Sequence, residues 1–385
     1  MMLIAITVTF IVGNYTGHVD ADVFRQGDFK AFYTAGLIVN EARGEDSLDL
    51  YDIEKQISIQ DQYDIIGPGE ELTIFLNPPA YAWLMAPISK LPYVTALNLW
   101  RLISIAVASI SIVILTRRLK LDFKWWDTLT ILLVSFPGFV VMISGQNTFL
   151  FIGLYAFSFG LLMRGHDFSA GALLGLGALK PQLFLFLPVV LLFQKKWHAL
   201  MGFAAGSLSV LLFSAAMIGP GGLIEYFQLF TTDVYSYGIQ IQADKMHSFP
   251  AFVRLLFGLE INPTYLALFT ALALTAVFAY LSLKRGYEFE VSSLYSLAIL
   301  GTIIINPHLF HYDLALLLLP FLFIYSWTRR NELSYILSRN LRLALVLLFA
   351  YLWLGFLFIE MIKVQVSVLL IIYLFVLILN KRKSS

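Results

Sequence analysis

The chain has 385 residues, of which 59% are hydrophobic and only 13% are charged, and its formal net charge is +1. Soluble domains carry about 25% charged residues, so this composition excludes a soluble enzyme and a disordered chain, and the charge balance excludes a nucleic-acid binder. The absence of cysteine excludes disulfides, thiol nucleophiles and cysteine-ligated metals. The sequence therefore predicts a polytopic membrane protein.

Long apolar runs predict an all-α protein with about 11–12 transmembrane helices, because a spanning helix needs roughly 17–25 mostly apolar residues. The candidate spans, in chain order, lie at about 1–15, 92–116, 127–143, 147–163, 168–179, 182–193, 199–218, 263–283, 290–305, 309–327, 341–359 and 364–380. The first is short and resembles a signal peptide, but it lacks a basic start and a clean cleavage site, which favours a retained anchor. The segment 168–193 either crosses twice or forms a re-entrant hairpin that turns at Lys180-Pro181.

The remaining segments are predicted to be loops on the outer side of the membrane, within a single transmembrane domain that covers residues 1–385. The two large loops are 14–76, which is strongly acidic, and 219–262. Apolar periodicity predicts amphipathic surface helices at about 28–43 and 52–63. Prolines at 78, 79, 87 and 92 predict a short interfacial helix at about 79–90.

Orientation follows from the lysines and arginines, which mark cytoplasmic loops. They cluster at 117–124, 164, 195–196, 284–285, 329–342 and 381–383. With twelve crossings, all these clusters fall on one side, so both termini are predicted in the cytoplasm of a plasma (inner) membrane protein.

Polar residues at the opposite ends of the spans form four stretches that are predicted to converge on the outer face. They are Gly27-Asp28, Ser144 to Asn147, Lys180-Pro181, and Asn306-Pro307-His308 with His311 and Asp313. Helix caps and interfacial turns also use such residues. That explanation is weaker for Lys180, His311 and Asp313, because ionisable groups in apolar runs are costly.

Three sets of charged residues have competing interpretations. Asp28 opens the 28–43 helix, so it is either a helix N-cap or, beside Tyr33, a general base for a sugar hydroxyl. Arg101 lies inside a span and either binds a lipid phosphate or neutralises a nearby acid. Asp20-Ala-Asp22 resembles a DxD metal motif, but acid pairs are expected by chance in so acidic a loop.

The ordered motifs resemble glycosyltransferase family 87, whose members are polyprenol-phosphate-sugar-dependent mannosyltransferases and their relatives. The motifs are Gly27 to Gly36, Leu50-Tyr51-Asp52, Phe75 to Pro79, Leu91-Pro92 with Trp100, Gly145-Gln146-Asn147, Gly171 to Gly177 with Lys180-Pro181, and Asn306-Pro307-His308 with Tyr312. Family members commonly have Tyr-Pro-Pro where this chain has Asn77-Pro78-Pro79. The resemblance implies a GT-C-like fold and a metal-free, inverting sugar transfer, typically of mannose, on the extracytoplasmic face.

The resemblance assigns the catalytic carboxylate to Asp28 and leaves the other roles to candidates. Lys180, His308, His311 and Arg101 are candidates for the donor phosphate, and Tyr33, Gln146, Asn147 and Asn306 for the sugar or acceptor. The implied partners are a polyprenyl-phosphate sugar donor, a glycolipid or glycan acceptor and the lipid bilayer, with no cofactor and no nucleic acid. A transporter or flippase and a non-catalytic envelope-assembly subunit remain the alternative functions.

Overall fold

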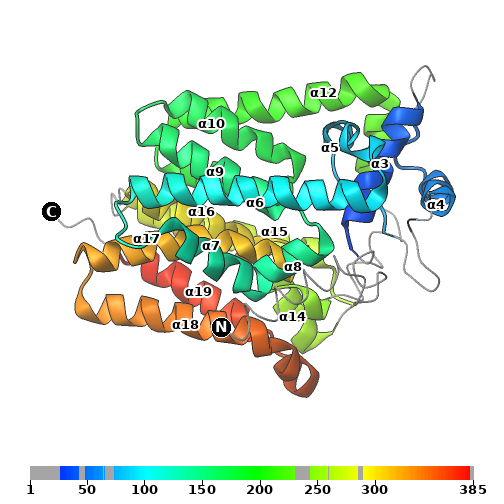
Figure 1. Cartoon of the computed structure of the whole chain (residues 1–385). Helices are drawn as coiled ribbons and strands as arrows, with labels where there is room; N and C mark the ends of the chain where they lie inside the picture. The colour runs from blue at the N-terminus through cyan, green and yellow to red at the C-terminus, as the bar shows by residue number, and fades with distance from the viewer. Residues whose placement is uncertain are drawn as a thin grey trace.

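The computed structural model describes residues 27–42, 48–63, 65, 73–229, 243–258, 260–284 and 289–381. Over these residues the chain forms sixteen α-helices and no β-strand (Figure 1), which confirms the prediction of an all-α protein. The predicted 1–15 span, the Asp20/Asp22 pair and parts of both large loops lie outside the described residues.

The helices follow the predicted order. Their bounds are α3 Phe29–Glu41, α4 Ile53–Gln62, α5 Pro79–Met85, α6 Tyr93–Arg118, α7 Trp125–Val134, α8 Phe136–Ser144, α9 Thr148–Leu162, α10 Asp167–Gly175, α11 Leu187–Phe193, α12 Trp197–Leu229, α14 Phe249–Phe257, α15 Pro263–Lys284, α16 Val291–Ile305, α17 Leu318–Arg329, α18 Tyr335–Ile362 and α19 Val366–Leu379. Short 3-10 helices occur at η1 Ile88–Lys90, η2 Leu176–Leu179, η3 Pro181–Leu183, η4 Ala243–Lys245 and η5 His311–Leu317.

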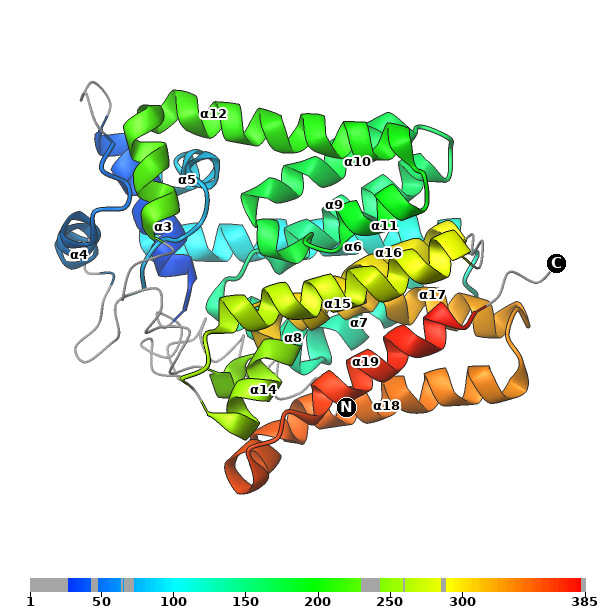
Figure 2. The same ribbon diagram turned by 180° about the vertical axis from the view of Figure 1, so that it is seen from behind.

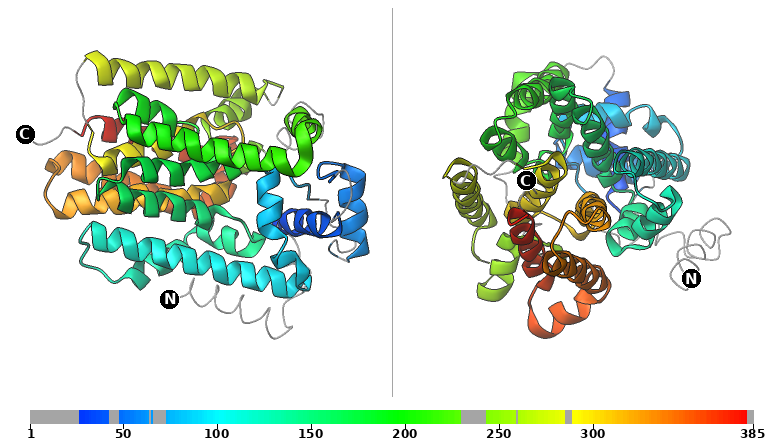
Figure 3. Two further views of the ribbon diagram at one scale, coloured as in Figure 1. Left: turned by 90° about the horizontal axis from the view of Figure 1, so that it is seen from above. Right: turned by 90° about the vertical axis from the view of Figure 1, so that its left-hand side faces the viewer.

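The long helices run back and forth between two ends of the molecule (Figures 1 and 3). One end, here called the α3 end, holds α3 and α5 together with the start of α6. The other, the C-terminal end, holds the end of α6 and the end of α19. Successive long helices among the described residues therefore run in alternating directions between the two ends.

The longest apolar helices lie on the outside of the bundle. Within the described residues, four helices are long and apolar enough to cross a membrane, namely α6, α12, the Pro263–Leu283 part of α15 and the Tyr335–Gly355 part of α18. Between 22% and 39% of the most apolar window in each is buried, and α12 and α18 form opposite edges of the molecule (Figure 2). The remaining apolar surface of these helices is suited to face lipid.

Shorter apolar helices fill the interior. α9 and α16 have 15 residues each, and nearly all of α16 is buried. A helix that is covered by protein need not match the bilayer thickness, because neighbouring protein segments, and not lipid, contact its sides and ends. The structure thus supports a multi-pass membrane protein. Among the described residues, four helices, or up to five if α7 and α8 count as one bent span, are candidate spans by length and composition.

One predicted span is broken. The segment 127–143 was expected to be a single helix, but α7 and α8 meet at an angle of 75°. The break lies at Ser135, whose extended backbone caps α8 through a 3.3 Å hydrogen bond from the Gly138 N–H. Pro137 occupies the first turn of α8, where a missing N–H costs nothing, whereas inside a continuous helix it would remove a hydrogen bond.

The α3 helix is present as predicted, but it is not an amphipathic surface helix. Every residue from Phe29 to Ile38 is buried, because α5, α6, η1 and α4 surround it. The short helix α4 fits the surface description better, since only Gln56, Ile59 and Gln60 are buried, on one face.

Described residues from two of the predicted basic clusters make contacts at the C-terminal end. Arg329 pairs with Asp122, and Arg330 Nη2 donates to the Leu119 carbonyl at 2.7 Å. Lys381 Nζ lies 2.8 Å from Glu290 Oε2, which joins the last helix to the start of α16. These contacts tie together turns that are far apart in sequence.

Candidate active site

A cavity of about 440 Å³ opens among the turns at the α3 end. Its lining is contributed by six separate stretches of the chain. The polar lining residues are Asp28, Thr73, Asn77, Gln146, Asn147, Lys180, Gln182, Tyr226, His308, Tyr312 and Asp313. Five of the residues proposed from sequence therefore meet at one cavity.

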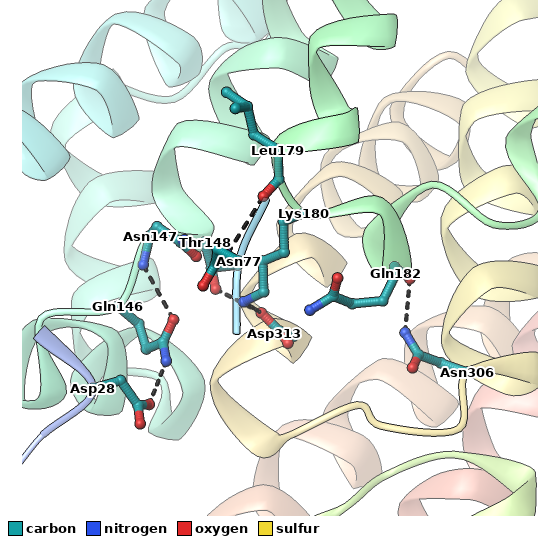
Figure 4. A network of polar contacts seen from close by, with 10 residues as sticks. All are labelled: Asp28, Asn77, Gln146, Asn147, Thr148, Leu179, Lys180, Gln182, Asn306 and Asp313. Atoms are coloured by element: carbon teal, nitrogen blue, oxygen red, sulfur yellow. Dashed lines mark hydrogen bonds and ion pairs between the residues drawn. The ribbon is translucent and has the colours of Figure 1, made fainter. Parts of the chain in front are cut away.

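Asp28 lies on one wall of this cavity. It precedes α3, yet its carboxylate makes no hydrogen bond to the helix backbone. Instead it accepts a hydrogen bond from Gln146 Nε2 (Figure 4). The N-cap explanation therefore does not account for the carboxylate.

Burial raises the pKa of Asp28 above its usual value of 3.8. The hydrogen bond from Gln146 and the positive charge of Lys180 act in the opposite direction, and the charge of Asp313 adds to the increase. Because burial dominates, the Asp28 carboxylate binds a proton more readily than an exposed aspartate does.

Two glycines allow α3 to approach the α8–α9 turn. Gly145 has a left-handed backbone with φ of 65°, and a Cβ there would lie 2.7 Å from the Phe29 Cβ. A Cβ on Gly27 would lie 2.7 Å from the Ser144 backbone. The close contact places Gln146, which follows Gly145 directly, beside Asp28.

Lys180 and Asp313 form a buried ion pair on another wall. Lys180 Nζ lies 2.7 Å from Asp313 Oδ1, and the two side chains are 5% and 2% exposed. Thr148 Oγ1 donates to the same oxygen at 2.8 Å. Lys180 Nζ also lies 5.0 Å from the centre of the Tyr312 ring. Both charges are thus fixed by partners on other elements.

Lys180 occupies the break between two short halves of the 168–193 segment. α10 and η2 lead to it, and η3 and α11 lead away from it. Asn77 Nδ2 donates to the Leu179 carbonyl at 3.4 Å, and Asn306 Nδ2 donates to the Gln182 carbonyl at 2.7 Å. Side-chain hydrogen bonds from Asn77 and Asn306 therefore hold the turn that carries Lys180 on both sides (Figure 4).

His308 lies two residues after Asn306 in the chain. Its backbone N–H donates to Asn306 Oδ1 at 2.8 Å, and its ring lines the cavity. Burial, aided by the charge of Lys180, lowers the pKa of His308 to about 4. At neutral pH the imidazole is uncharged, so it is suited to hydrogen bonding and not to ion pairing with a phosphate.

Asn147 presents a buried amide to the cavity. The side chain is 0% exposed, and neither its Oδ1 nor its Nδ2 makes a hydrogen bond of good geometry with the described residues, although Tyr81 lies near it. A buried amide without such bonds is costly. It is therefore suited to bind a polar ligand.

Four residues proposed from sequence lie away from the cavity lining. Arg101 donates to the carbonyls of Met142 and Ile143 at 2.8 and 2.9 Å, at the end of α8. The Tyr33 hydroxyl donates to the Leu91 carbonyl at 2.7 Å. Asn306 makes the hydrogen bond to the Gln182 carbonyl described above. The His311 ring packs at 5.4 Å from that of Phe136.

The cavity also contains residues to which the sequence gave no role. Asp313 was conspicuous in an apolar stretch, but its pairing with Lys180 spans 133 positions. Asn77 and Tyr312 belong to the family motifs but had no chemical role assigned to them, and Gln182 carries no signal in the sequence. Among the described residues no group of three or more His, Asp or Glu side chains is placed to hold a metal ion.

Comparison with known proteins identifies the family. The model of glycosyltransferase family 87 matches residues 75–307, which is more than half of the chain. The chain belongs to glycosyltransferase family 87. It is therefore a membrane glycosyltransferase, as the resemblance predicted. No curated protein and no solved structure matches the chain.

The matched segment contains only part of the cavity. Gln146, Asn147 and Lys180 lie within it, whereas Asp28, His308 and Asp313 lie outside it. Roles for these last three residues therefore depend on the geometry of the cavity and on the local resemblance of the Gly27–Gly36 stretch.

Proposed function

We propose that this glycosyltransferase transfers a sugar, mannose in the first instance, from a polyprenyl-phosphate donor to a glycolipid or glycan acceptor at the extracytoplasmic face. The observation that carries the proposal is a buried carboxylate with raised pKa and a buried lysine on the walls of one cavity. The cavity lies at the end of the bundle opposite the basic residues Arg329, Arg330 and Lys381. A donor held in the bilayer by its isoprenoid tail could reach that end without a nucleotide-binding domain.

In the proposed reaction Asp28 is the general base. It takes the proton of the acceptor hydroxyl as that oxygen attacks C1 of the sugar from the side opposite the phosphate. The bond between C1 and the phosphate oxygen breaks, and the phosphate leaves with the bonding electrons. The anomeric configuration therefore inverts, and one negative charge passes from Asp28 to the leaving phosphate.

Lys180 is the proposed partner of that phosphate. Its ammonium is held at the cavity wall before the donor arrives, so little reorganisation is needed as charge develops. The neutral His308 ring is positioned to donate or accept a hydrogen bond nearby. Gln146 orients Asp28, and Asn147 is the first candidate for a sugar hydroxyl.

The remaining sequence candidates take supporting roles in this proposal. Arg101, Tyr33 and Asn306 bind backbone carbonyls that hold the cavity walls, and His311, at the start of η5, packs against Phe136. The proposal thus places Asp28, Lys180, Gln146, Asn147 and His308 in contact with substrates.

The donor class is tested with membranes that contain the full chain. They are incubated with radiolabelled polyprenyl-phosphate sugars in the presence of EDTA, and the labelled lipid product is identified. Transfer is expected with EDTA present and not directly from GDP- or UDP-sugars. Loss of transfer in EDTA that Mn²⁺ or Mg²⁺ restores would contradict the metal-free mechanism and direct attention to Asp20 and Asp22.

Orientation is tested by reporter fusions. Fusions after residues 60, 145 and 307 should report the extracytoplasmic side, and fusions after 120 and 196 should report the cytoplasm. A cytoplasmic residue 60 would overturn the proposed location of the active site.

A further inference from the structure

Asp313 has a charge opposite to the one expected in a phosphate site. Its carboxylate is 2% exposed, lines the cavity, and receives both Lys180 Nζ at 2.7 Å and Thr148 Oγ1 at 2.8 Å on Oδ1. It neutralises the lysine that is proposed to bind the donor. A site selected only for tight phosphate binding would not keep an anion beside its cation.

The substrate and product of the proposed reaction differ in charge, and this inference rests on that proposed function. The donor is a phosphodiester with a single negative charge. The product is a phosphomonoester, whose second ionisation has a pKa of about 6. At neutral pH the product therefore carries close to two negative charges in the place where the donor carried one.

We propose that Asp313 makes the cavity disfavour the doubly charged polyprenyl phosphate relative to the singly charged donor, and thereby promotes product release. Coulomb repulsion from Asp313 grows with the charge on the phosphate. The positive charge of Lys180 is already paired with Asp313, so it cannot fully offset the second negative charge of the product. The bond from Thr148 keeps the carboxylate at the wall, so the repulsion persists when the phosphate approaches. Product release limits turnover in many enzymes, and a lipid product that dissociates slowly would block the site.

The first test measures equilibrium binding to the purified full chain in lipid nanodiscs. The two probes are a short-chain polyprenyl phosphate and its methyl ester, which is a non-reactive phosphodiester. Asp313→Asn preserves the shape and an acceptor for Thr148. It is expected to tighten binding of polyprenyl phosphate on the order of tenfold and that of the methyl ester by about threefold or less.

Thr148→Ser is the matched control. It keeps the hydroxyl that donates to Asp313 and leaves the charge in place, so the ratio of the two affinities should stay at the wild-type value. In turnover assays Asp313→Asn should show stronger inhibition by added polyprenyl phosphate. Equal tightening of both probes, or weaker binding of both, would mean that Asp313 is only a structural partner of Lys180.

A second test needs no variant, in case Asp313→Asn does not fold. For the wild-type chain, the affinity for polyprenyl phosphate relative to the methyl ester should fall as the pH rises through about 6. The titratable groups that face this region are Asp28, Lys180, Asp244, Lys245, His308, His311 and Tyr312, and they act on both probes. The ratio of the affinities for the two probes therefore reports the second ionisation of the monoester. A constant or rising ratio would refute the proposal.

The outcomes also separate this inference from the proposed function. If the wild-type chain binds neither probe, the donor class is wrong and both proposals fail. If it binds both probes but the ratio responds neither to Asp313→Asn nor to pH, only the role of Asp313 fails.

Discussion

Two buried lysines at opposite ends of the molecule make similar contacts in different settings. Lys180 pairs with Asp313 at 2.7 Å and lies 5.0 Å from the Tyr312 ring. Lys381 pairs with Glu290 at 2.8 Å and lies 4.1 Å from the Trp327 ring. Both lysine side chains are 5% exposed.

The difference lies in what surrounds each pair. Lys180 and Asp313 both line the 440 Å³ cavity, whereas Lys381 joins the end of the chain to Glu290 and Glu332, which are 39% and 24% exposed. A buried ion pair is thus poor evidence for a functional site on its own. The cavity, and the second carboxylate within it, distinguish the α3 end.

The largest contrast between the two ends is expected at their carboxylates. Asp28→Asn should lower turnover about 10²–10⁴-fold, the usual scale for loss of a general base, while donor binding persists. Asp122→Asn, at the C-terminal end, should leave turnover within a few-fold because that carboxylate is 52% exposed and away from the cavity. Initial rates of labelled-sugar transfer measure both variants.

A control for helix capping is available in the same loop. Asp52 caps α4 through a 3.1 Å hydrogen bond from the Lys55 N–H, and asparagine caps nearly as well as aspartate. Asp52→Asn should therefore be silent. Near-normal turnover by well-folded Asp28→Asn protein would remove Asp28 from the mechanism.

The lysines should separate activity from stability. Lys180→Met combined with Asp313→Asn removes both charges of the pair. It avoids the cost of a single buried charge and should lower kcat/KM for the donor about 10²-fold with little change in thermal stability. Lys381→Met should instead lower the free energy of unfolding by about 1–3 kcal/mol, with normal kcat/KM for the folded protein.

Transfer kinetics and thermal unfolding in detergent measure the two effects. A folded and fully active Lys180→Met/Asp313→Asn variant would mean that the Lys180–Asp313 pair has only a structural role, like the Lys381–Glu290 pair.

The pH dependence should report the environment of Asp28. Because burial raises its pKa above 3.8, the carboxylate loses its proton only at a higher pH than an exposed aspartate. Activity of wild-type protein should therefore fall on acidification at a pH above 3.8, and the residual activity of Asp28→Asn should lack this limb. A profile of kcat/KM against pH measures the effect.

The same shift affects stability with a defined sign. A carboxyl whose pKa is raised by folding stabilises the fold while protonated, and this contribution is lost as the pH rises through the folded-state pKa. At neutral pH Asp28 is therefore destabilising, and Asp28→Asn should unfold at the same or a higher temperature than wild type. A clear decrease would indicate that the carboxylate holds the fold.

The order of the helices was predictable from sequence, whereas their surroundings were not. Apolar runs punctuated by Pro and basic residues place α6, α9, α15 and α16 closely, since length and hydropathy are local properties. The burial of α3 on all sides depends on α5, α6 and η1, which no periodicity within α3 reveals.

Some residues of the candidate site could also be predicted from the sequence, whereas their contacts could not. Lys180 and Asp313 were conspicuous because ionisable groups in apolar runs are costly, whereas Asp28 and Gln146 were singled out by the polar stretches and by the family resemblance. The bond from Gln146 to Asp28 spans 118 positions, and the Lys180–Asp313 pair spans 133, so only the fold brings them together. Pro137 is the local sequence signal for the break between α7 and α8, although it lies within a continuous apolar run.

The smallest predicted effect compares two arginines that both bind backbone carbonyls. Arg101 holds the end of α8 through Met142 and Ile143, and Arg330 holds the end of α6 through the Leu119 carbonyl. Each replacement by methionine should lower the free energy of unfolding by about 1–2 kcal/mol, because bonds from a charged donor are lost. Arg101 differs in that Gly145 and Gln146 follow the turn it holds. Arg101→Met should therefore also lower kcat by a few-fold without changing the KM for the donor, whereas Arg330→Met should leave both unchanged. A rise in donor KM for Arg101→Met would show instead that this arginine binds the donor phosphate, as its position inside a span first suggested, and the boundary of the site would then extend behind the α8–α9 turn.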